Sequence, residues 1–449
     1  MGLSNFTRFG FILAASGSAV GLGNIWKFSY MVGDYGGSAF VLVYLLSVLF
    51  VGLSVLIAEI IIGYLGQSNA VVSFKSLTPT ESKIKWQYAG FSAFTGLIIL
   101  TFYSVVIGWI LYYLFNSFFE LPIDMTVSKE KFNYLLGNQI GFQIFFHLVS
   151  TLLIGVIIIK GVKNGIEKVN KILMPLLIII ILGLLAYSIT LNGFSKAIDF
   201  MFSFDFSKLT SDAIVQAVGH SFFTLSIGIA AILTYAASLP KNTNIFKASI
   251  YIVIVDTGVA IISGIMLYAF VFEFSNNPSN GPGLVFVSLP VVFAQLGLVG
   301  TIFSILFFTA LAFAGITSAI SIIEPSVMYF IDKFNITRFK ATIFLSSFFF
   351  IIGVLVLLSY TSEYGSLFSF FDIPLFDILD KLTTNILMPV GGLVVAIFIG
   401  FIVPKQKVYE SLISFTSAKI IDIWYFNLRF IAIPALIFTL LNLIGIIKI

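Results

Sequence analysis

Apolar residues are grouped along this chain into eleven long segments, separated by short polar connections. A membrane-spanning helix needs about 20 predominantly apolar residues to cross the hydrocarbon core of a bilayer. The predicted spans are 8–30, 38–66, 87–118, 141–160, 170–190, 211–239, 245–273, 298–331, 338–359, 376–402 and 427–447. This pattern predicts an all-α polytopic membrane protein, with one transmembrane domain over residues 1–449.

Small and polar residues interrupt the first and the sixth predicted spans. Residues 16–24 hold three glycines and two serines, and residues 222–228 hold Thr, Ser and Gly, so an unbroken helix is disfavoured there. Backbone that unwinds within a bilayer must turn its free polar groups to protein, water or an ion. Interrupted helices in corresponding positions of two halves predict a midplane binding site in a secondary transporter. The alternative for Gly17 and Gly21 is close packing of continuous helices through small residues.

The composition supports the membrane class and excludes several kinds of site. Of the 449 residues, 59% are hydrophobic and 10% are charged, whereas soluble domains have about 45–50% apolar and about 25% charged residues. The chain has no cysteine, which excludes disulfides and thiolate metal sites. Two histidines are too few for a polyhistidine metal centre. The first apolar segment is longer than a signal peptide, so we expect a retained span.

The distribution of Lys and Arg predicts the orientation in the membrane. An odd number of spans places the two termini on opposite sides. With the N-terminus inside, 17 of the 24 Lys and Arg residues fall on the inner side and six on the outer side, and Lys27 lies within a span. The positive-inside rule therefore predicts a cytoplasmic N-terminus and an outer C-terminus in the cell membrane. We see no basic patch that would indicate a nucleic-acid partner.

Polar residues within the spans are the candidate functional groups, because ionisable side chains in a bilayer are costly. Asp256 lies in an apolar run with no cation nearby in sequence. Asn24, Thr224, Asp256 and freed carbonyls would form an oxygen cage of the kind that hard cations such as Na⁺ prefer. The alternative is a protonated Asp256 that bonds to a neighbouring helix. We interpret Glu59 as part of a structural network.

Three further stretches of the sequence have a local structural interpretation. Thr317 and Ser318 are adjacent hydroxyls in the eighth span, and such hydroxyls usually bond back to carbonyls of their own helix. Residues 67–86 predict a short interfacial helix. Residues 275–297 read as a turn followed by a semi-apolar segment, which is either a lid over an outer vestibule or an exposed loop.

Three motifs resemble the neurotransmitter:sodium symporter family. Residues 10–37, with Ser-Ala-Val-Gly-Leu-Gly-Asn-Ile-Trp-Lys-Phe, are similar to its first helix. Phe-Phe-Thr-Leu-Ser-Ile-Gly at 222–228 resembles its sixth helix, and Ala-Gly-Ile-Thr-Ser at 314–318 its eighth. The resemblance implies alternating access by two inverted five-helix repeats with broken helices 1 and 6. The corresponding ranges are 8–190 for the first repeat, 211–402 for the second and 427–447 for an additional helix.

The resemblance also implies two sodium sites and one amino-acid site. The first sodium site would comprise Ala19, Asn24, Thr224 and Asp256, together with the substrate carboxylate. The second would comprise Gly17, Val20, Ala314, Thr317 and Ser318. The substrate would be surrounded by Ala19, Gly21, Gly23, Ile99, Tyr103, Phe223, Thr224, Ser226, Ile229, Ser318 and Ile322.

The gates and the anion requirement are further expectations from the family pattern. Lys27 and Asp380 match an outer ion pair, with Tyr103 and Phe223 as an aromatic lid. Asp332 matches the acid of the inner gate. The arginine that usually pairs with this acid is absent, because Gly2 and Asn5 occupy the region just before the first helix. Ser238 stands where the family commonly has a tyrosine that supports the inner gate. Ala260 and His220 stand where animal members bind chloride, so we expect chloride-independent transport, with His220 as a hydrogen-bonded core residue.

The expected function is sodium-coupled import of a hydrophobic or aromatic amino acid, because no predicted wall residue is charged. One alternative is proton-driven transport on the same scaffold. Another is an amino-acid sensor or channel. We expect no enzymatic activity, two sodium ions, a lipid environment, and a monomer or loose dimer.

Overall fold

The computed structural model describes residues 6–240, 242–274 and 283–447, and in this part the fold is almost entirely helical. The first ten α-helices are α1 (Arg8–Ala19), α2 (Phe28–Asp34), α3 (Ser38–Ser47), α4 (Leu53–Gly66), α5 (Ala70–Leu77), α6 (Ala93–Asn116), α7 (Met125–Asn138), α8 (Ile140–Ile159), α9 (Lys168–Ser188) and α10 (Gly193–Phe202). The remaining ones are α11 (Ser211–Thr224), α12 (Ala231–Ala236), α13 (Ile245–Phe274), α14 (Leu289–Gln295), α15 (Gly297–Phe334), α16 (Arg338–Leu358), α17 (Leu375–Leu382), α18 (Met388–Ile397), α19 (Lys405–Leu412), α20 (Ala418–Asn427) and α21 (Ile433–Leu443).

Short π-helical and 3₁₀ segments join several of these helices into longer rods. The π-helical segments are η1 (Gly23–Lys27), η2 (Val48–Gly52), η4 (Val162–Glu167), η6 (Leu284–Ser288), η7 (Thr383–Leu387), η8 (Phe398–Ile402) and η9 (Leu428–Ala432). The 3₁₀ segments are η3 (Trp86–Ser92) and η5 (Phe206–Lys208). A two-stranded antiparallel hairpin pairs β1 (Ser369–Phe370) with β2 (Ile373–Pro374).

The predicted polytopic architecture with broken helices is confirmed. Within the described ranges, nine helices are long and apolar enough to cross a membrane, and α1 with the helix over Gly23–Asp34 forms a tenth span bent by 48°. The sixth predicted span is present as α11 and α12, which are separated by the non-helical residues 225–230. Neither piece is long enough to span a bilayer alone.

Two spans begin earlier than the apolar pattern predicts. The fifth begins at Val162 rather than at residue 170, and the eleventh begins at Ala418 rather than at residue 427. In the eleventh span the hydroxyl of Ser417 caps the helix by accepting from the Ile420 N–H. Lys419 and Asp422 follow in its first turns. These charged residues interrupt the apolar run but not the helix, so a criterion based on hydrophobicity starts the span too late.

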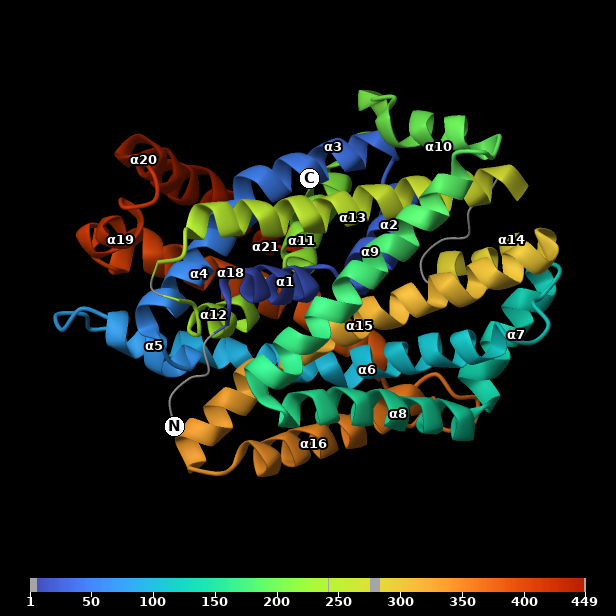
Figure 1. The fold of residues 1–449 in the computed structure, drawn as a ribbon, viewed down its shortest axis with the longest axis horizontal. Helices are drawn as coiled ribbons and strands as arrows, with labels where there is room; N and C mark the ends of the chain where they lie inside the picture. Colours follow the sequence, from blue (N-terminus) through green and yellow to red (C-terminus); the bar gives the residue numbers. More distant parts are fainter. Residues whose placement is uncertain (1–5, 241, 275–282, 448–449) are drawn as a thin grey trace.

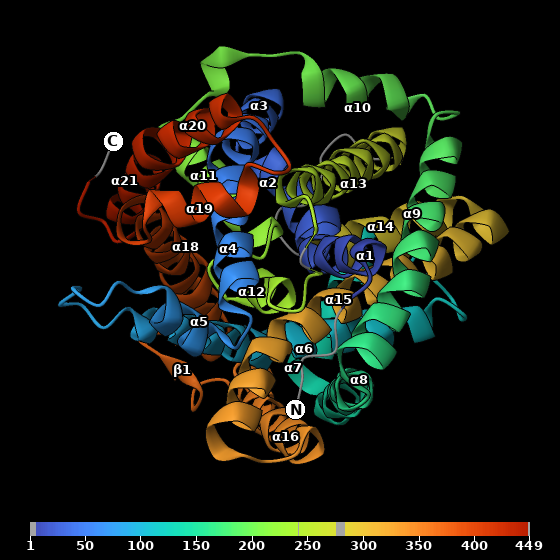
Figure 2. The same cartoon turned by 60° about the vertical axis from the view of Figure 1, so that its left-hand side comes forward.

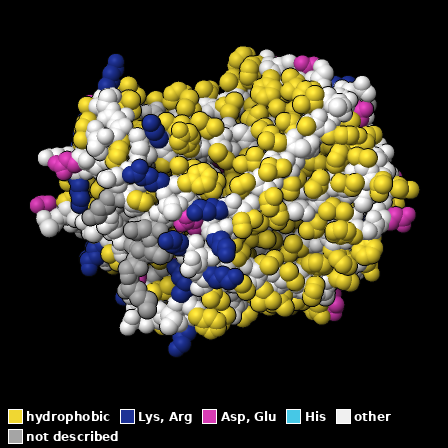
Figure 3. All heavy atoms as spheres, in the orientation of Figure 1, with side chains coloured by type: hydrophobic (Ala, Val, Ile, Leu, Met, Phe, Trp, Pro, Cys, Tyr) yellow, Lys and Arg dark blue, Asp and Glu magenta, His cyan; other side chains and the backbone are white. Residues whose placement is uncertain are grey.

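The long helices run between two ends of the molecule. Figure 1 shows α7 and α14 at one end, and α5 and α19 at the opposite end; Figure 2 shows the long helices bundled around the buried α1 and α12. Hydrophobic side chains cover most of the face in Figure 3, whereas Lys and Arg gather towards the α5 end. This arrangement is that of a membrane-embedded belt with one strongly basic end.

The two helix breaks arise from different backbone features. In α1 the helix ends because Val20 adopts an extended conformation (φ −71°, ψ 95°). After α11, Ser226, Gly228 and Ala230 all have positive φ angles of 53°, 83° and 59°, which an α-helix does not allow. A Cβ atom at Gly228 would overlap the carbonyl oxygen of Met388, so this loop packs backbone against backbone on α18.

The connections follow the sequence expectations in part. Residues 67–86 contain the short helix α5, as predicted. In the lid candidate, residues 275–282 lie outside the described part, and the rest forms η6 and α14. Leu284, Phe286 and Phe293 are at most 1% exposed. The described part of this segment, residues 283–297, therefore packs into the protein rather than forming an exposed loop.

The packing of the second break generates a stability prediction. Gly228→Ala should lower the free energy of unfolding by about 2–5 kcal/mol, since it adds a steric overlap to a positive φ angle. Gly183→Ala is the matched control, because a Cβ at Gly183 meets no atom within 4 Å. The measurement is the thermal unfolding midpoint of the purified protein in detergent. Equal midpoints for the two variants would contradict the proposed backbone packing.

Candidate functional site

The break in α1 releases three backbone carbonyls. The Gly21 N–H donates to Asn24 Oδ1 (2.9 Å) and the Leu22 N–H donates to the Tyr103 hydroxyl (3.3 Å). In a continuous helix these two N–H groups would bond the carbonyls of Gly17 and Ser18. In this described stretch no backbone hydrogen bond joins the Gly23 N–H to the carbonyl of Ala19, so that carbonyl also lacks its helical partner. The break therefore points several carbonyl oxygens away from their own helix.

Hydrogen bonds of Ser18 connect α1 to the second break and to α15. Its carbonyl accepts hydrogen bonds from the hydroxyls of Ser226 (2.8 Å) and Ser318 (3.2 Å). Its own hydroxyl accepts from Ser321 (2.7 Å). Because Ser226 lies in the second break and Ser318 and Ser321 lie on α15, these bonds join α1 near its break both to the second break and to α15.

Asn24, Thr224 and Asp256 form a fully buried polar cluster. The Asn24 amide donates to Asp256 Oδ1 (2.6 Å) and to Thr224 Oγ1 (2.8 Å), and the Thr224 hydroxyl donates to Asp256 Oδ1 (2.9 Å). All three side chains are at most 1% exposed. Asp256 Oδ2 has no hydrogen-bond partner among the described residues. A carboxylate oxygen left in this way is costly unless a cation or a proton compensates it.

The second predicted sodium cluster shows a mixed result. The Thr317 hydroxyl donates to the carbonyls of Phe313 (2.9 Å) and Ala314 (3.1 Å), as the plain interpretation expects. Nevertheless, α15 presents this region to the broken end of α1. A Cβ atom at Gly21 would lie 3.1 Å from the Ser318 hydroxyl oxygen. The freed Gly17 carbonyl and the Thr317–Ser318 pair therefore belong to facing elements.

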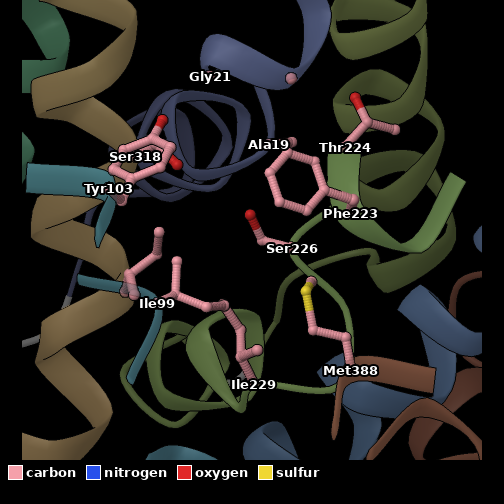
Figure 4. Close-up of a pocket in the computed structure, with 12 residues that line it drawn as sticks. Ala19, Gly21, Ile99, Tyr103, Phe223, Thr224, Ser226, Ile229, Ser318 and Met388 are labelled. Carbon is pink, nitrogen blue, oxygen red and sulfur yellow. The ribbon is translucent and has the colours of Figure 1, made fainter. Parts of the chain in front are cut away.

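One small cavity collects all the predicted substrate residues. Its volume is about 20 Å³, enough for about one water molecule. Figure 4 shows Phe223 from the end of α11, Ser226 from the second break, Tyr103 from α6 and Met388 from α18 around this cavity. None of its lining side chains is charged. The lining consists of Ala19, Gly21, Gly23, Ile99, Tyr103, Phe223, Thr224, Ser226, Ile229, Ser318, Ile322 and Met388.

A larger cavity, here called the vestibule, lies beyond an aromatic wall. It has a volume of about 220 Å³ and shares Tyr103 and Phe223 with the small cavity. Lys27 and Asp380 both line it. The expected ion pair between them is not formed, since no N–O distance of 4.0 Å or less joins these two described residues. The Lys27 ammonium instead lies 4.4 Å from the centroid of the Phe223 ring.

At the α5 end, Asp332 has a neutral partner. The Asn69 amide donates to Asp332 Oδ2 (2.7 Å), and Asn69 Oδ1 caps α5 by accepting from the Val72 N–H (3.1 Å). The Phe6 N–H donates to the carbonyl of Ser238 (3.2 Å), and the Phe6 ring packs against Tyr235. Gly2 and Asn5, where the family has its arginine, lie outside the described residues.

Three other buried residues bear on the expectations. The Glu59 carboxylate accepts from the Gly228 N–H at 3.5 Å, a contact consistent with a structural role in the second break. His220 differs from the expectation, because neither of its ring nitrogens has a hydrogen-bond partner in the described structure. Its ring instead packs among Phe28, Tyr44 and Phe223. Ala260 is buried and offers no polar side chain there.

The sequence interpretation missed Met388, Ser18 and Ser321. Met388 is 2% exposed and comes from α18, a helix to which no substrate residue was assigned. The adjacent Gly391–Gly392 pair was the available signal, because consecutive glycines within a span indicate close approach of another backbone. Ser18 and Ser321 were overlooked because isolated serines in helices usually bond back to their own carbonyls.

Comparison with known proteins identifies the relatives of this chain. A model of the Sodium:neurotransmitter symporter family matches residues 4–134 and 136–449. The sodium-dependent transporter YhdH of Bacillus subtilis is 34% identical over 98% of both chains, and a sodium-dependent transporter of Haemophilus influenzae is 30% identical over 96% of this chain and 95% of its own. The crystal structure of MhsT in complex with L-phenylalanine is similar, with a TM-score of 0.89 and 37% identity over 98% of this chain and 99% of MhsT.

The contacts at the α5 end predict how firmly that end is closed. The chain has no cysteine, so Ser238→Cys provides a single reporter at a position that is 2% exposed. Adding Asn69→Ala removes the bond to Asp332 and should raise the rate of maleimide labelling at residue 238 roughly five- to thirtyfold. Asn133→Ala, on the exposed face of α7, is the control. Unchanged labelling in the Asn69 variant would show that this bond does not hold the end closed.

Proposed function

This chain belongs to the sodium:neurotransmitter symporter family, and from that premise we propose that it couples two Na⁺ ions to the import of an aromatic or large aliphatic amino acid. It is a multi-pass membrane protein and a sodium-dependent transporter. The observation that carries the proposal is an uncharged cavity beside a buried carboxylate that has one oxygen without a partner. Such a pair of features suits a zwitterion with an apolar side chain and a cation next to it.

The substrate class follows from the cavity walls. Ile99, Ile229 and Ile322 provide apolar walls, and a charged substrate side chain would find no partner there. The Tyr103 hydroxyl and the N–H groups near Gly21 and Gly23 would receive the substrate carboxylate, because amides at a helix start favour anions. MhsT was crystallised with L-phenylalanine, and this similarity supports an aromatic substrate here.

We assign the first Na⁺ to the Asp256 cluster. Its ligands would be the Ala19 carbonyl, Asn24, Thr224, Asp256 and the substrate carboxylate. The buried cluster of Asn24, Thr224 and Asp256 supports this assignment through its oxygen donors and its uncompensated charge. Sodium and substrate would each complete the other's site, which makes their binding mutually favourable.

We assign the second Na⁺ to the interface between α1 and α15. The carbonyls of Gly17, Val20 and Ala314 and the hydroxyls of Thr317 and Ser318 would be its ligands. The Gly17 carbonyl that the helix break releases supports this assignment. The Thr317 hydroxyl would have to exchange its two bonds within α15 for the cation.

We infer alternating access through two gates and two inverted repeats, 8–190 and 211–402, with the last span as an additional helix. Tyr103 and Phe223 would close over the substrate, and Lys27 would then approach Asp380 across the vestibule. Asp332 and Asn69 would separate when the other end opens. The basic α5 end supports a cytoplasmic N-terminus and an outer C-terminus.

Transport should be independent of chloride. Asp256 places a fixed negative charge beside the first Na⁺, so no anion is needed to balance that cation there. His220 and Ala260 offer little support for an anion, since His220 packs among aromatic rings and Ala260 has no polar group.

Uptake into proteoliposomes tests the function. We expect accumulation of labelled tyrosine, tryptophan or leucine with an inward Na⁺ gradient, equally in chloride and in gluconate. Asp256→Ala and Thr317→Ala should each lower the initial rate roughly 10- to 100-fold, because each removes ligands of a desolvated ion. Asp212→Ala on the exposed face of α11 and Thr439→Ala on α21 are the matched controls.

Other outcomes would select among the alternatives. Equal uptake in Na⁺ and K⁺ gradients, driven instead by a pH gradient, would replace sodium coupling by proton coupling. Binding without uptake of any amino acid would favour a sensor. If Thr317→Ala keeps sodium-dependent uptake and Asp256→Ala loses it, only the first of the two proposed Na⁺ sites stands.

Met388 generates a prediction on substrate size. Met388→Ala enlarges the cavity and should shift the ratio of kcat/KM for tryptophan over leucine about tenfold towards tryptophan, since buried methylene groups discriminate by roughly this factor. Met266→Ala is the control, because Met266 is equally buried but lies outside the cavity. Competition uptake measures the ratio. The same change in both variants, or none in either, would contradict a role of Met388 in selectivity.

A further inference from the structure

A third cavity lies at the α7 end of the molecule, away from the substrate cavity. Its volume is about 220 Å³, similar to that of the vestibule, and it shares no lining residue with either of the other two. Residues of α6, α7, α14 and α15 line it, together with the connection between α6 and α7. Figure 1 shows α7 and α14 next to each other beyond the end of α6.

Hydrogen bonds fix the walls of this third cavity. The hydroxyls of Ser117 and Ser304 are 2.7 Å apart and join α6 to α15. The Ser128 hydroxyl donates to the carbonyl of Val287 (2.8 Å) and joins α7 to η6. The Tyr112 hydroxyl donates to Gln139 Oε1 (2.8 Å) and joins α6 to the connection between α7 and α8. The cavity is therefore a preformed space between elements that are bonded to one another.

The lining combines aromatic rings with two opposite charges. Tyr113, Tyr134 and Phe308 supply aromatic surface. Glu120 lies in the α6–α7 connection, and Lys131 lies on α7 one helical turn from Ser128 and from Tyr134, so these α7 side chains share one face. Neither Glu120 nor Lys131 forms an ion pair or a hydrogen bond with another described residue. Both charges are thus free to meet a ligand.

We propose that this cavity is a second binding site, and that its ligand is an aromatic amino acid in its zwitterionic form. Glu120 receives the ammonium group, Lys131 receives the carboxylate, and the ring of the ligand packs against Tyr113, Tyr134 and Phe308. A ligand with only one charge leaves either Glu120 or Lys131 unpaired. The two opposite charges therefore favour a zwitterion over an amine or an acid.

Phe286 connects this site to the vestibule. Its ring centroid lies 5.0 Å from that of Tyr113, which lines the third cavity, and 5.8 Å from that of Trp26, which lines the vestibule. Phe286 belongs to η6, which leads directly into α14. A ligand packed on Tyr113 holds η6 and α14 in place and so affects the closing of the vestibule. This consequence for transport rests on the proposed function, whereas binding itself does not.

Binding of tritiated L-tryptophan to the purified full-length chain in nanodiscs tests the proposal. The measurement uses Na⁺-free buffer and the Asp256→Ala background, so that the central site does not contribute. We expect saturable binding of one molecule per chain, which Glu120→Gln and Lys131→Gln each weaken at least tenfold. Lys129→Gln and Glu130→Gln are the matched controls, because both residues are exposed on α7 but do not line the cavity.

Competition by two ligand analogues, each of which lacks one of the two charges, completes the test. Phenethylamine lacks the carboxylate and 3-phenylpropionate lacks the ammonium, and each should compete at least tenfold more weakly than L-phenylalanine. Absence of Na⁺-independent binding, or equal affinity in all four charge variants, would overturn the proposal. If this binding is retained while the wild-type chain shows no sodium-driven uptake, the proposed function fails and the second site stands.

Discussion

Backbone polarity inside an apolar bundle is the constraint on which this structure depends. Each helix break exposes N–H and carbonyl groups that the lipid cannot satisfy, so other segments of the protein must supply partners. Tyr103 and Asn24 take the N–H groups released by the break in α1, and Ser226 and Ser318 bond to the carbonyl of Ser18. The second break is held by α18, against which its backbone packs directly. The small cavity lined by Tyr103, Phe223 and Ser226 lies where these compensating contacts converge.

Charge compensation is the second requirement, and it connects the site to ion coupling. Asp256 is fully buried, and Asn24 and Thr224 satisfy only one of its carboxylate oxygens. The neighbouring cavity offers no charged side chain for a substrate. A cation between the carboxylate of Asp256 and that of an amino acid would serve both. Under the proposed function, sodium and substrate therefore stabilise each other, because each supplies the opposite charge that the other requires.

The two ends of the molecule are stabilised differently. At the α5 end a neutral amide, Asn69, bonds to Asp332, and the Phe6 backbone bonds to Ser238. At the other end, Lys27 and Asp380 face the vestibule without a direct ion pair. Aromatic rings lie between the vestibule and the third cavity. Among them, Phe286 contacts Trp26 in the wall of the vestibule and Tyr113 in the wall of the third cavity. The two ends therefore differ, because hydrogen bonds join the elements at the α5 end, whereas Lys27 and Asp380 line a cavity of about 220 Å³ at the other end.

By itself, the sequence determined the membrane class and the approximate positions of the spans and of both helix breaks, because hydrophobic length and runs of glycine and serine are local properties. Motif resemblance also named every residue around the substrate cavity except Met388. Only the tertiary structure decided that Met388 completes that cavity, that Asn69 contacts Asp332, and that His220 has no hydrogen-bond partner among the described residues. These features depend on side chains from helices far apart in sequence, and their contacts are set by the packing of the helices, which no local pattern of hydrophobic and polar residues encodes.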